Sequence, residues 1–339
     1  MSKTKRFIMI CAIVCAVGIA FSLAGIAAGG VKNLHKVSEH HSWFNFGPSY
    51  VNMDESTENV GDFTKIEAEG PMDIVVVAPG QEVESEGLMN KFLENVVIDS
   101  GLLSGDPGTV DVRWPKGKDK PEVKNDNGVL KIKVDKKYTN FVGFNFDIGD
   151  GDEDSDGAGS TVPVVIIHCT ADQLDKIKIV DYCGDAFIIG AKSSDTDLNL
   201  DFGDIVVLRG SGDELSLITS AGDVWIDSAD YGKTTVKSDA GDTVISGCNG
   251  DISLKTDSGD VDISGCTGNI HAEANYGDIS FKSSLPQDKF DISVKAEYGD
   301  VNIGGNTYED PSKEITFKGG PNKITLTTDT GDINVKFKK

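Results

Sequence analysis

Aspartate directly follows glycine at eight regularly spaced places in the C-terminal half of the chain, and these carboxylates are its most regular reactive groups. The pairs recur every 18 or 19 residues, and the last two steps lengthen to 22 and 32. They are Gly184-Asp185, Gly203-Asp204, Gly222-Asp223, Gly241-Asp242, Gly259-Asp260, Gly277-Asp278, Gly299-Asp300 and Gly331-Asp332. Such a carboxylate can accept backbone hydrogen bonds in a turn or bind cations. The calcium-binding nonapeptide repeat is absent, which favours the turn.

A second acidic feature lies between these repeats and the N-terminus. Asp152, Asp154 and Asp156 stand at positions 1, 3 and 5 of a segment with glycine at position 6, as in a calcium loop. Position 12 is Pro163 instead of the bidentate glutamate, and no helical pattern flanks the segment. We therefore expect an acidic insertion at 147–159 with at most weak calcium binding, and no other cofactor.

Residues that could support nucleophilic chemistry are few and scattered. Cys248 and Cys266 each follow Ser-Gly one repeat apart, so stacking would bring their Cα atoms within disulfide range, with free thiols as the alternative. His168 and Cys169 are neighbours in a predicted strand, so their side chains should point to opposite faces. Aromatic residues make up only 7% of the chain, and we expect no ladder of rings for stacking on sugars. No catalytic residue is predicted, and the protein is not expected to be an enzyme.

The repeats must be built from short strands. Each Gly-Asp pair precedes an alternating strand such as Ile205–Val207, and a second strand lies upstream of nearly every pair. A repeat this short cannot bury its apolar face alone, so the copies must stack. The sequence therefore predicts an all-β fold, a β-solenoid of about eight two-strand coils over residues 174–339. The longer steps are expected to be loops that project from the stack, at Ser283–Lys289 and Gly304–Asn322.

The middle residue of each strand that follows a Gly-Asp pair should point out of the stack. It is apolar in the first four coils and polar in the last four. The apolar members are Phe187, Val206, Trp225 and Val244. Left exposed, they would form a large adhesive patch. We expect the N-terminal half to pack over this patch, and a binding partner is the alternative.

Residues 61–173 have β-type patterns but no repeat. This half is expected to cap the first coil, because an open end would be an edge for aggregation. Its predicted strands and one short helix are Ile74–Val77, Val96–Ile98, Val129–Val134, Val162–Ile167 and the helix Gly87–Glu94.

The N-terminus predicts a membrane anchor. Residues 7–29 carry no charge and are long enough to span the hydrocarbon core as one helix. Lys3, Lys5 and Arg6 precede this span, which places residues 1–6 in the cytoplasm. We expect a single-pass protein of the cell membrane, with a stalk at 30–60 and an extracytoplasmic C-terminal domain. A cleaved signal peptide ending near Ala24 is the alternative.

The chain is strongly acidic, with a formal net charge of -23 and a pI near 4.5. Such a body repels nucleic acid, which is excluded as a partner. The expected partners are the membrane through the N-terminal helix, and cell wall, a host surface glycan or a cationic peptide through the exported domain.

Several motifs resemble a known family. Phe63, Ile66, Gly70 and Asp73-Ile74 are spaced like the family's opening, and Gly128–Ile132, Val162–Ile166 and Leu174–Ile179 resemble its middle. The chain is similar over residues 60–339 to the bacterial putative-adhesin β-strand-repeat domain family of unknown function, found on envelope proteins including relatives of the Lia envelope-stress system. The resemblance implies a non-enzymatic envelope binding module. The alternatives are an envelope-stress sensing component that binds cationic peptides or a partner membrane protein, and a structural rod that assembles end to end.

Overall fold

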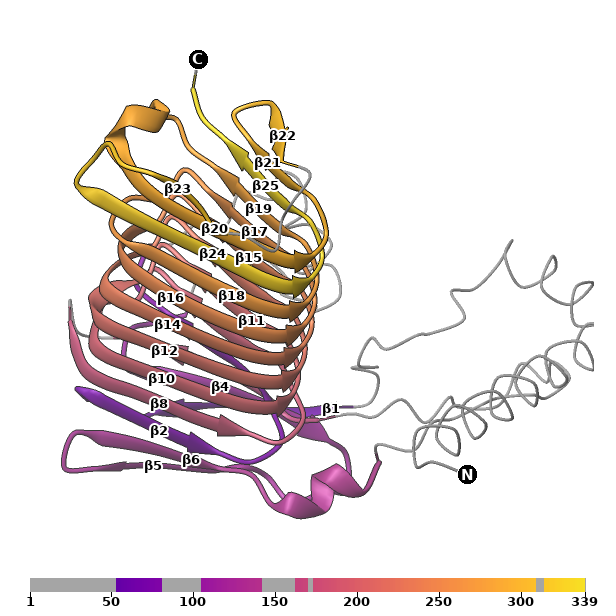
Figure 1. The fold of residues 1–339 in the computed structure, drawn as a ribbon. Helices are drawn as coiled ribbons and strands as arrows, with labels where there is room; N and C mark the ends of the chain where they lie inside the picture. Colours follow the sequence, from indigo (N-terminus) through magenta and orange to yellow (C-terminus); the bar gives the residue numbers. More distant parts are fainter. Residues whose placement is uncertain (1–52, 81–104, 142–161, 170–172, 309–313, 339) are drawn as a thin grey trace, which may run out of the picture. The chain divides into compact units, whose positions relative to one another are not determined.

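The computed structural model describes residues 53–80, 105–141, 162–169, 173–308 and 314–338 (Figure 1). These residues all lie in one compact unit, 48–339. No helix among the described residues is both long enough and apolar enough to cross a bilayer. Several predicted features lie outside the described residues, namely the span at 7–29, most of the stalk at 30–60, the strand Val96–Ile98, the helix Gly87–Glu94 and the acidic insertion at 147–159.

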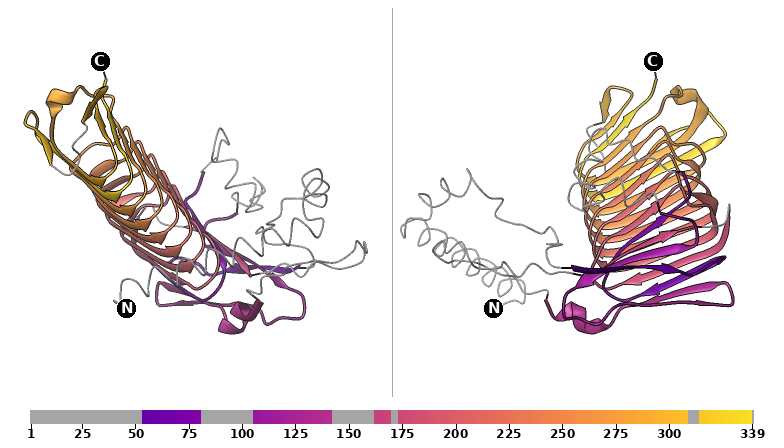
Figure 2. Two further views of the ribbon diagram at one scale, coloured as in Figure 1. Left: turned by 45° about the vertical axis from the view of Figure 1, so that its right-hand side comes forward. Right: turned by 180° about the vertical axis from the view of Figure 1, so that it is seen from behind.

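The described residues form two large, mostly parallel sheets, which confirms the all-β prediction (Figures 1 and 2). Each coil, defined as one pair of consecutive strands, contributes a long strand to the 12-stranded sheet and a short strand to the 13-stranded sheet. The long strands of the first coils are β8 (Leu174–Asp181), β10 (Ser193–Phe202), β12 (Ser211–Ala221), β14 (Asp230–Ala240), β16 (Asn249–Ser258) and β18 (Ile270–Tyr276). Their short partners are β9 (Ala186–Ile189), β11 (Ile205–Leu208), β13 (Val224–Asp227), β15 (Thr243–Ser246), β17 (Val261–Ser264) and β19 (Ile279–Lys282).

The stack departs from sequence order at its C-terminal end. The last coil in the chain consists of β24 (Asn322–Thr330) and β25 (Ile333–Lys336). It lies between the β18–β19 coil and the coil of β20 (Phe290–Tyr298) and β21 (Val301–Ile303) (Figure 1). Ile324 therefore pairs with Ile270 on one side and with Ile292 on the other.

The N-terminal half supplies two more coils. β2 (Lys65–Glu69) and β3 (Asp73–Val77) pair in parallel with β8 and β9. β6 (Val129–Lys133) and β7 (Val164–His168) then pair in parallel with β2 and β3. The 3₁₀ turn η2 (Lys136–Phe141) follows β6. This half thus continues the stack without carrying the adjacent Gly-Asp pair.

Antiparallel strands close both ends of the stack. At the N-terminal end, β5 (Glu122–Asp126) pairs with β6, β4 (Thr109–Pro115) with β7, and β1 (Met53–Asn59) with β4. At the other end, β22 (Asn306–Tyr308) pairs with β21 and β23 (Ile315–Phe317) with β20. Residues 304–322 are therefore not simply a projecting loop, because their strands satisfy backbone groups that an open sheet edge would leave unpaired. The shorter insertion contains the 3₁₀ turn η3 (Gln287–Lys289).

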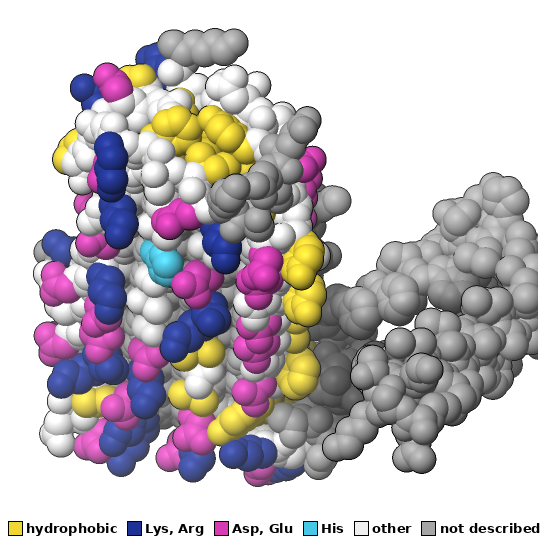
Figure 3. Space-filling model, in the orientation of Figure 1, with side chains coloured by type: hydrophobic (Ala, Val, Ile, Leu, Met, Phe, Trp, Pro, Cys, Tyr) yellow, Lys and Arg dark blue, Asp and Glu magenta, His cyan; other side chains and the backbone are white. Residues whose placement is uncertain are grey.

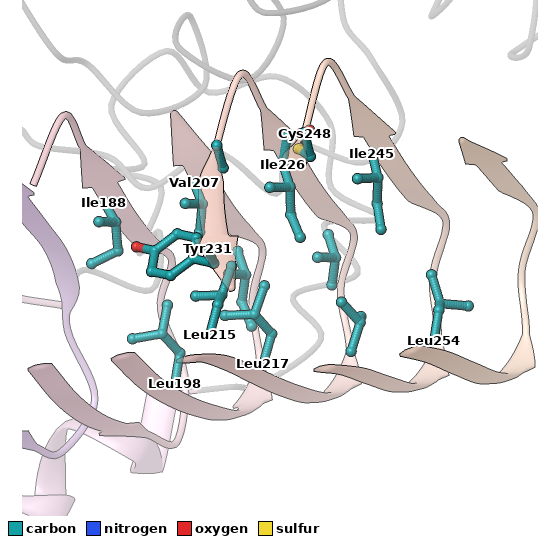
Figure 4. Close-up of a cluster of buried hydrophobic side chains, with 14 of the residues drawn as sticks. Ile188, Leu198, Val207, Leu215, Leu217, Ile226, Tyr231, Ile245, Cys248 and Leu254 are labelled. Atoms are coloured by element: carbon teal, nitrogen blue, oxygen red, sulfur yellow. The ribbon is translucent and has the colours of Figure 1, made fainter. Parts of the chain in front are cut away.

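The interior between the sheets is filled by aliphatic side chains (Figure 4). Leu198, Leu215 and Leu217 from the long strands face Ile188 and Val207 from the short strands. All five are fully buried. Alternation along each strand directs one side chain inward and the next outward, so the repeat buries the same set in every coil. Each fully buried aliphatic residue contributes about 1.5–3 kcal/mol relative to exposure.

Candidate functional site

The aspartates of the Gly-Asp pairs form a hydrogen-bonded ladder along the stack. From Asp73 onward, Oδ1 of each corner aspartate accepts the backbone N–H of the corner aspartate in the next coil, at donor–acceptor distances of 2.7–3.0 Å. The order is Asp73, Asp185, Asp204, Asp223, Asp242, Asp260, Asp278, Asp332 and Asp300. The carboxylates thus accept backbone hydrogen bonds at the turns. Asp73, in the N-terminal half, is the first member of the ladder although no glycine precedes it directly.

The glycine of each pair is required by close backbone contact. The corner glycines have φ between 130° and 154°, a region that other residues rarely adopt. A Cβ built on Gly203, Gly222 or Gly241 would overlap the carbonyl oxygen of the corner glycine in the preceding coil. The pair is therefore a structural device in which glycine allows the approach and aspartate joins the coils.

The N-terminal end of the ladder is desolvated. Burial, followed by the nearby Asp73 carboxylate, raises the pKa of Asp185 to about 7. Burial, followed by the Asp185 charge, raises the pKa of Asp204 to about 6. Burial also raises the pKa of Asp181, whose carboxylate accepts the backbone N–H groups of Met72 and Cys183. Burial at this end of the ladder therefore disfavours the charged carboxylate, the form that binds cations, relative to an exposed aspartate.

No cluster of three or more metal-ligating side chains is found among the described residues. Asp152, Asp154 and Asp156, the predicted weak calcium ligands, lie outside them. The ladder offers one carboxylate per coil, and a backbone N–H already occupies one oxygen of each.

The predicted outward column is buried at its N-terminal end. Phe187 and Val206 are fully buried, whereas Trp225 and Val244 are half-buried. Phe187 and Val206 belong to an apolar cluster on the outer face of the short-strand sheet, and Trp225 packs against it. The other members are Val75, Val77, Val164, Ile166, Ile189 and Leu208. Phe187 and Val206 are therefore not accessible to a binding partner.

Within the described part of the chain, the cysteines and histidines do not form a reactive centre. Cys248 and Cys266 are free, buried thiols in adjacent coils. Cys169 lies in the core, where burial raises its pKa to about 12. His168, its neighbour in the strand, instead has Nε2 3.0 Å from Oδ2 of Asp111. The cysteine is thus poorly ionised and separated from the histidine.

One surface feature departs from the expectation, drawn from the low aromatic content, that the chain has no ladder of rings. Four large hydrophobic side chains are more than a third exposed among the described residues, and three occupy the same place in the coil, directly before a corner glycine. Phe202, Tyr276 and Tyr298 are 59%, 65% and 70% exposed, and the fourth, Leu285, is 40% exposed. We name this position the corner column. Its described members, in spatial order, are Cys183, Phe202, Ala221, Ala240, Ser258, Tyr276, Thr330 and Tyr298.

An acidic column runs beside the corner column, one residue upstream on the outer face of the long-strand sheet (Figure 3). Its exposed carboxylates are Asp201, Asp239, Asp257, Asp329 and Glu297. Elsewhere on this sheet acids pair with lysines, as in Asp195–Lys176 and Glu214–Lys233. None of the five carboxylates forms an ion pair with another described residue. The corner thus presents aromatic rings beside exposed carboxylates, of which Asp257 accepts a hydrogen bond from the Asn275 amide. The residue before each repeated glycine was the signal that could have revealed it.

Comparison with known proteins agrees with this architecture. The family model described as Toastrack DUF4097 matches residues 107–336, which confirms the resemblance inferred from the motifs. None of the curated proteins matches the chain.

The solved structures that the chain matches are distant in sequence. A "putative adhesin" from Bacteroides fragilis is 12% identical, with 85% of this chain and 98% of that chain covered and a TM-score of 0.37. A "putative lipid binding protein" from Parabacteroides distasonis is 13% identical, with 84% and 98% covered and a TM-score of 0.39. A "putative adhesin" from Parabacteroides merdae is 12% identical, with 85% and 97% covered and a TM-score of 0.27.

Proposed function

We propose that this chain, which belongs to the Toastrack DUF4097 family, is a non-enzymatic binding module held at the outer side of a cell membrane. In this proposal the two sheets form a β-solenoid that presents its flank to a ligand of the cell envelope. The N-terminal span is its anchor.

The observation that carries the proposal is the corner column. Tyr276 and Tyr298 are exposed by about two thirds, and only four large hydrophobic side chains of the described residues are more than a third exposed. Exposed aromatic rings lose hydrophobic stabilisation unless a partner covers them, and they are enriched where proteins bind ligands. Their alignment along one edge suits an extended ligand better than a compact one.

The absence of enzymatic activity is supported by how the reactive groups are used. The repeated aspartates hold neighbouring coils together, and Cys169 is a buried thiol of high pKa. His168 interacts with Asp111, whose other oxygen accepts the hydroxyl of Thr57. A hydroxyl nucleophile would need to contact the histidine instead, so this arrangement lacks the geometry of a catalytic triad.

Membrane anchoring is supported by the uncharged run at 7–29 and the basic residues Lys3, Lys5 and Arg6 before it. Deletion of residues 1–29 is expected to move the protein from the membrane fraction to the soluble fraction. Cell fractionation followed by alkaline carbonate washing measures this, with the full-length chain as the control. A full-length chain that is already soluble, or that lacks its first residues by mass, would instead support a cleaved signal peptide.

Binding to the cell envelope is tested by retention of the full chain, in a detergent without sugar groups, on isolated cell walls. We expect retention at low salt and at about 0.5 M salt, because contacts between aromatic rings and a ligand are screened little by ions. A wall-free pellet control corrects for aggregation. Absence of retention at both salt concentrations would contradict the proposal.

A second candidate function, sensing of cationic peptides, is favoured by the unpaired carboxylates of the acidic column and by the net charge of -23. Binding of this kind weakens steeply as salt increases, which separates it from salt-tolerant binding to the cell envelope.

The third candidate, a rod that assembles end to end, is disfavoured because antiparallel strands close both ends of the stack.

A further inference from the structure

We propose that the corner column binds a linear β-1,4-linked glycan of neutral or amino sugars, lying along the axis of the stack. This inference rests on the proposed function and names the ligand class of the same surface. It follows from the spacing of the aromatic rings, the small residues between them and the polar groups beside them.

The rings are separated by even numbers of strands. Tyr276 and Tyr298 both pair with Thr330, from opposite sides, so they lie two strands apart. Phe202 lies four strands from Tyr276, beyond Ala221, Ala240 and Ser258. Because neighbouring strands are about 4.8 Å apart, two strands correspond to about 9.6 Å.

A β-1,4-linked glycan has a matching repeat. Each sugar is turned over relative to the one before, so the same face recurs at every second sugar, and one sugar is close to one strand spacing in length. Rings at even separations therefore meet equivalent sugar faces. The apolar C–H groups of a pyranose face pack on an aromatic ring, which also sheds its exposed apolar surface.

The residues between the rings are small. Thr330 separates Tyr276 from Tyr298, and Ala221, Ala240 and Ser258 separate Phe202 from Tyr276. An aromatic side chain at Thr330 would meet the oppositely turned sugar, whose substituents require room. The corner column thus has small residues at the odd positions, where the oppositely turned sugars of the glycan would lie.

The polar neighbours specify the charge of the ligand. Exposed carboxylates such as Asp239 and Asp329, and the oxygen of Asp257 that does not accept the Asn275 amide, can accept hydrogen bonds from sugar hydroxyls and from the ammonium groups of amino sugars. They repel an anionic glycan. Lys237 and Lys255 stand two residues before two of these acids and are also exposed. This mixture of charges disfavours a purely cationic ligand and suits sugars, which both donate and accept hydrogen bonds.

The test is calorimetric titration of the full chain, in a detergent without sugar groups, with defined hexasaccharides. We expect binding of the β-1,4-linked glucose or N-acetylglucosamine hexamer, and no binding of the α-1,4-linked glucose hexamer. Tyr276→Ala and Tyr298→Ala should each weaken binding by about fivefold or more. Leu285→Ala, which removes an exposed apolar side chain outside the column, is the matched control and should leave the affinity unchanged.

Two gain-of-ring variants test the spacing itself. Ala240→Tyr fills the vacant even position between Phe202 and Tyr276 and should strengthen binding by about threefold or more. Thr330→Tyr places a ring at an odd position and should not. Equal effects of the two variants, or no loss on Tyr276→Ala, would overturn the inference. Retention on cell walls that persists while every hexasaccharide fails to bind would overturn the inference and leave the proposed function standing, whereas loss of both would remove the two together.

Discussion

Gly222→Ala is expected to lower the free energy of unfolding by about 4 kcal/mol. The residue has φ of +151°, and a Cβ there would overlap the carbonyl oxygen of Gly203. The backbone strain and the forced separation of two packed coils each cost about 1–3 kcal/mol. The separation would also weaken the hydrogen bond that the Asp223 N–H donates to Asp204, now 2.7 Å long. Urea denaturation followed by circular dichroism measures the change.

Gly247→Ala is the matched control for this prediction. Gly247 has φ of +61°, and the nearest atom to a Cβ built there is Oγ of Ser228 at 3.6 Å. Arg209 and Ser228 occupy the equivalent corner in preceding coils with φ of +52° and +54°, so that corner tolerates a side chain. A cost of about 1 kcal/mol is expected. Equal destabilisation by the two substitutions would show that positive φ, and not contact between coils, is what requires glycine.

Stability is expected to fall as pH rises from about 5 to 8. The pKa of Asp185 is raised to about 7 and that of Asp204 to about 6, from 3.8, chiefly by burial. The folded state therefore binds more protons than the unfolded state between these values. The stabilisation is fully present below pH 3.8 and is lost as pH rises through the folded values. We expect a loss on the order of 3 kcal/mol, less than the sum of both shifts because the two carboxyls interact.

The groups around Asp185 reinforce this direction. Asp73, Asp181 and Asp204 are all acidic, and none supplies a compensating positive charge. The pKa values of Asp119 and Asp291, at the surface, are instead lowered by hydrogen bonds from Lys137 and Lys318. The stabilisation that these two ion pairs provide is lost only as pH falls below the ordinary pKa of aspartate. That pH range is lower than the one over which Asp185 and Asp204 titrate.

Asp185→Asn isolates the responsible group. The amide oxygen can still accept the N–H of Asp204, but the side chain no longer titrates. The variant should be more stable than the parent at pH 8 and should show a shallower decline between pH 5 and 8 in urea denaturation. Asp260→Asn, at an exposed rung of the same ladder, is the control. A parent protein whose stability increases over this range would contradict the account.

The coils were predictable because glycine, aspartate and alternating apolar residues recur together at a nearly constant interval. The two N-terminal coils were not recognised as part of the stack. In the first of them Pro71 and Met72 separate Gly70 from Asp73, so no Gly-Asp pair marks the corner. Asp73 nevertheless accepts the N–H of Asp185. A search for adjacent Gly-Asp pairs therefore misses Asp73, which belongs to the ladder through its hydrogen bond to the next coil.

The order of the last coils was not predictable from the repeat. The strands β18, β20 and β24 carry similar alternating apolar residues, and nothing local specifies which of them become neighbours. The long insertion at 304–322 gives the chain enough length for β24 to enter between β18 and β20. Because of this crossing, the spacing of the corner column could not be recognised from sequence order. Tyr276 and Tyr298 stand in consecutive repeats of the sequence, and only the inserted Thr330 gives them their two-strand separation.

The most direct measurement is competition between isolated cell wall and a soluble glycan for the full chain. Protein retained on the wall at about 0.5 M salt is washed with the β-1,4-linked N-acetylglucosamine hexamer or with the α-1,4-linked glucose hexamer. We expect release by the first and not by the second, and weaker retention of the Tyr276→Ala, Tyr298→Ala double variant. Retention that neither sugar disturbs, or that is already lost at this salt concentration, would contradict glycan binding by the corner column.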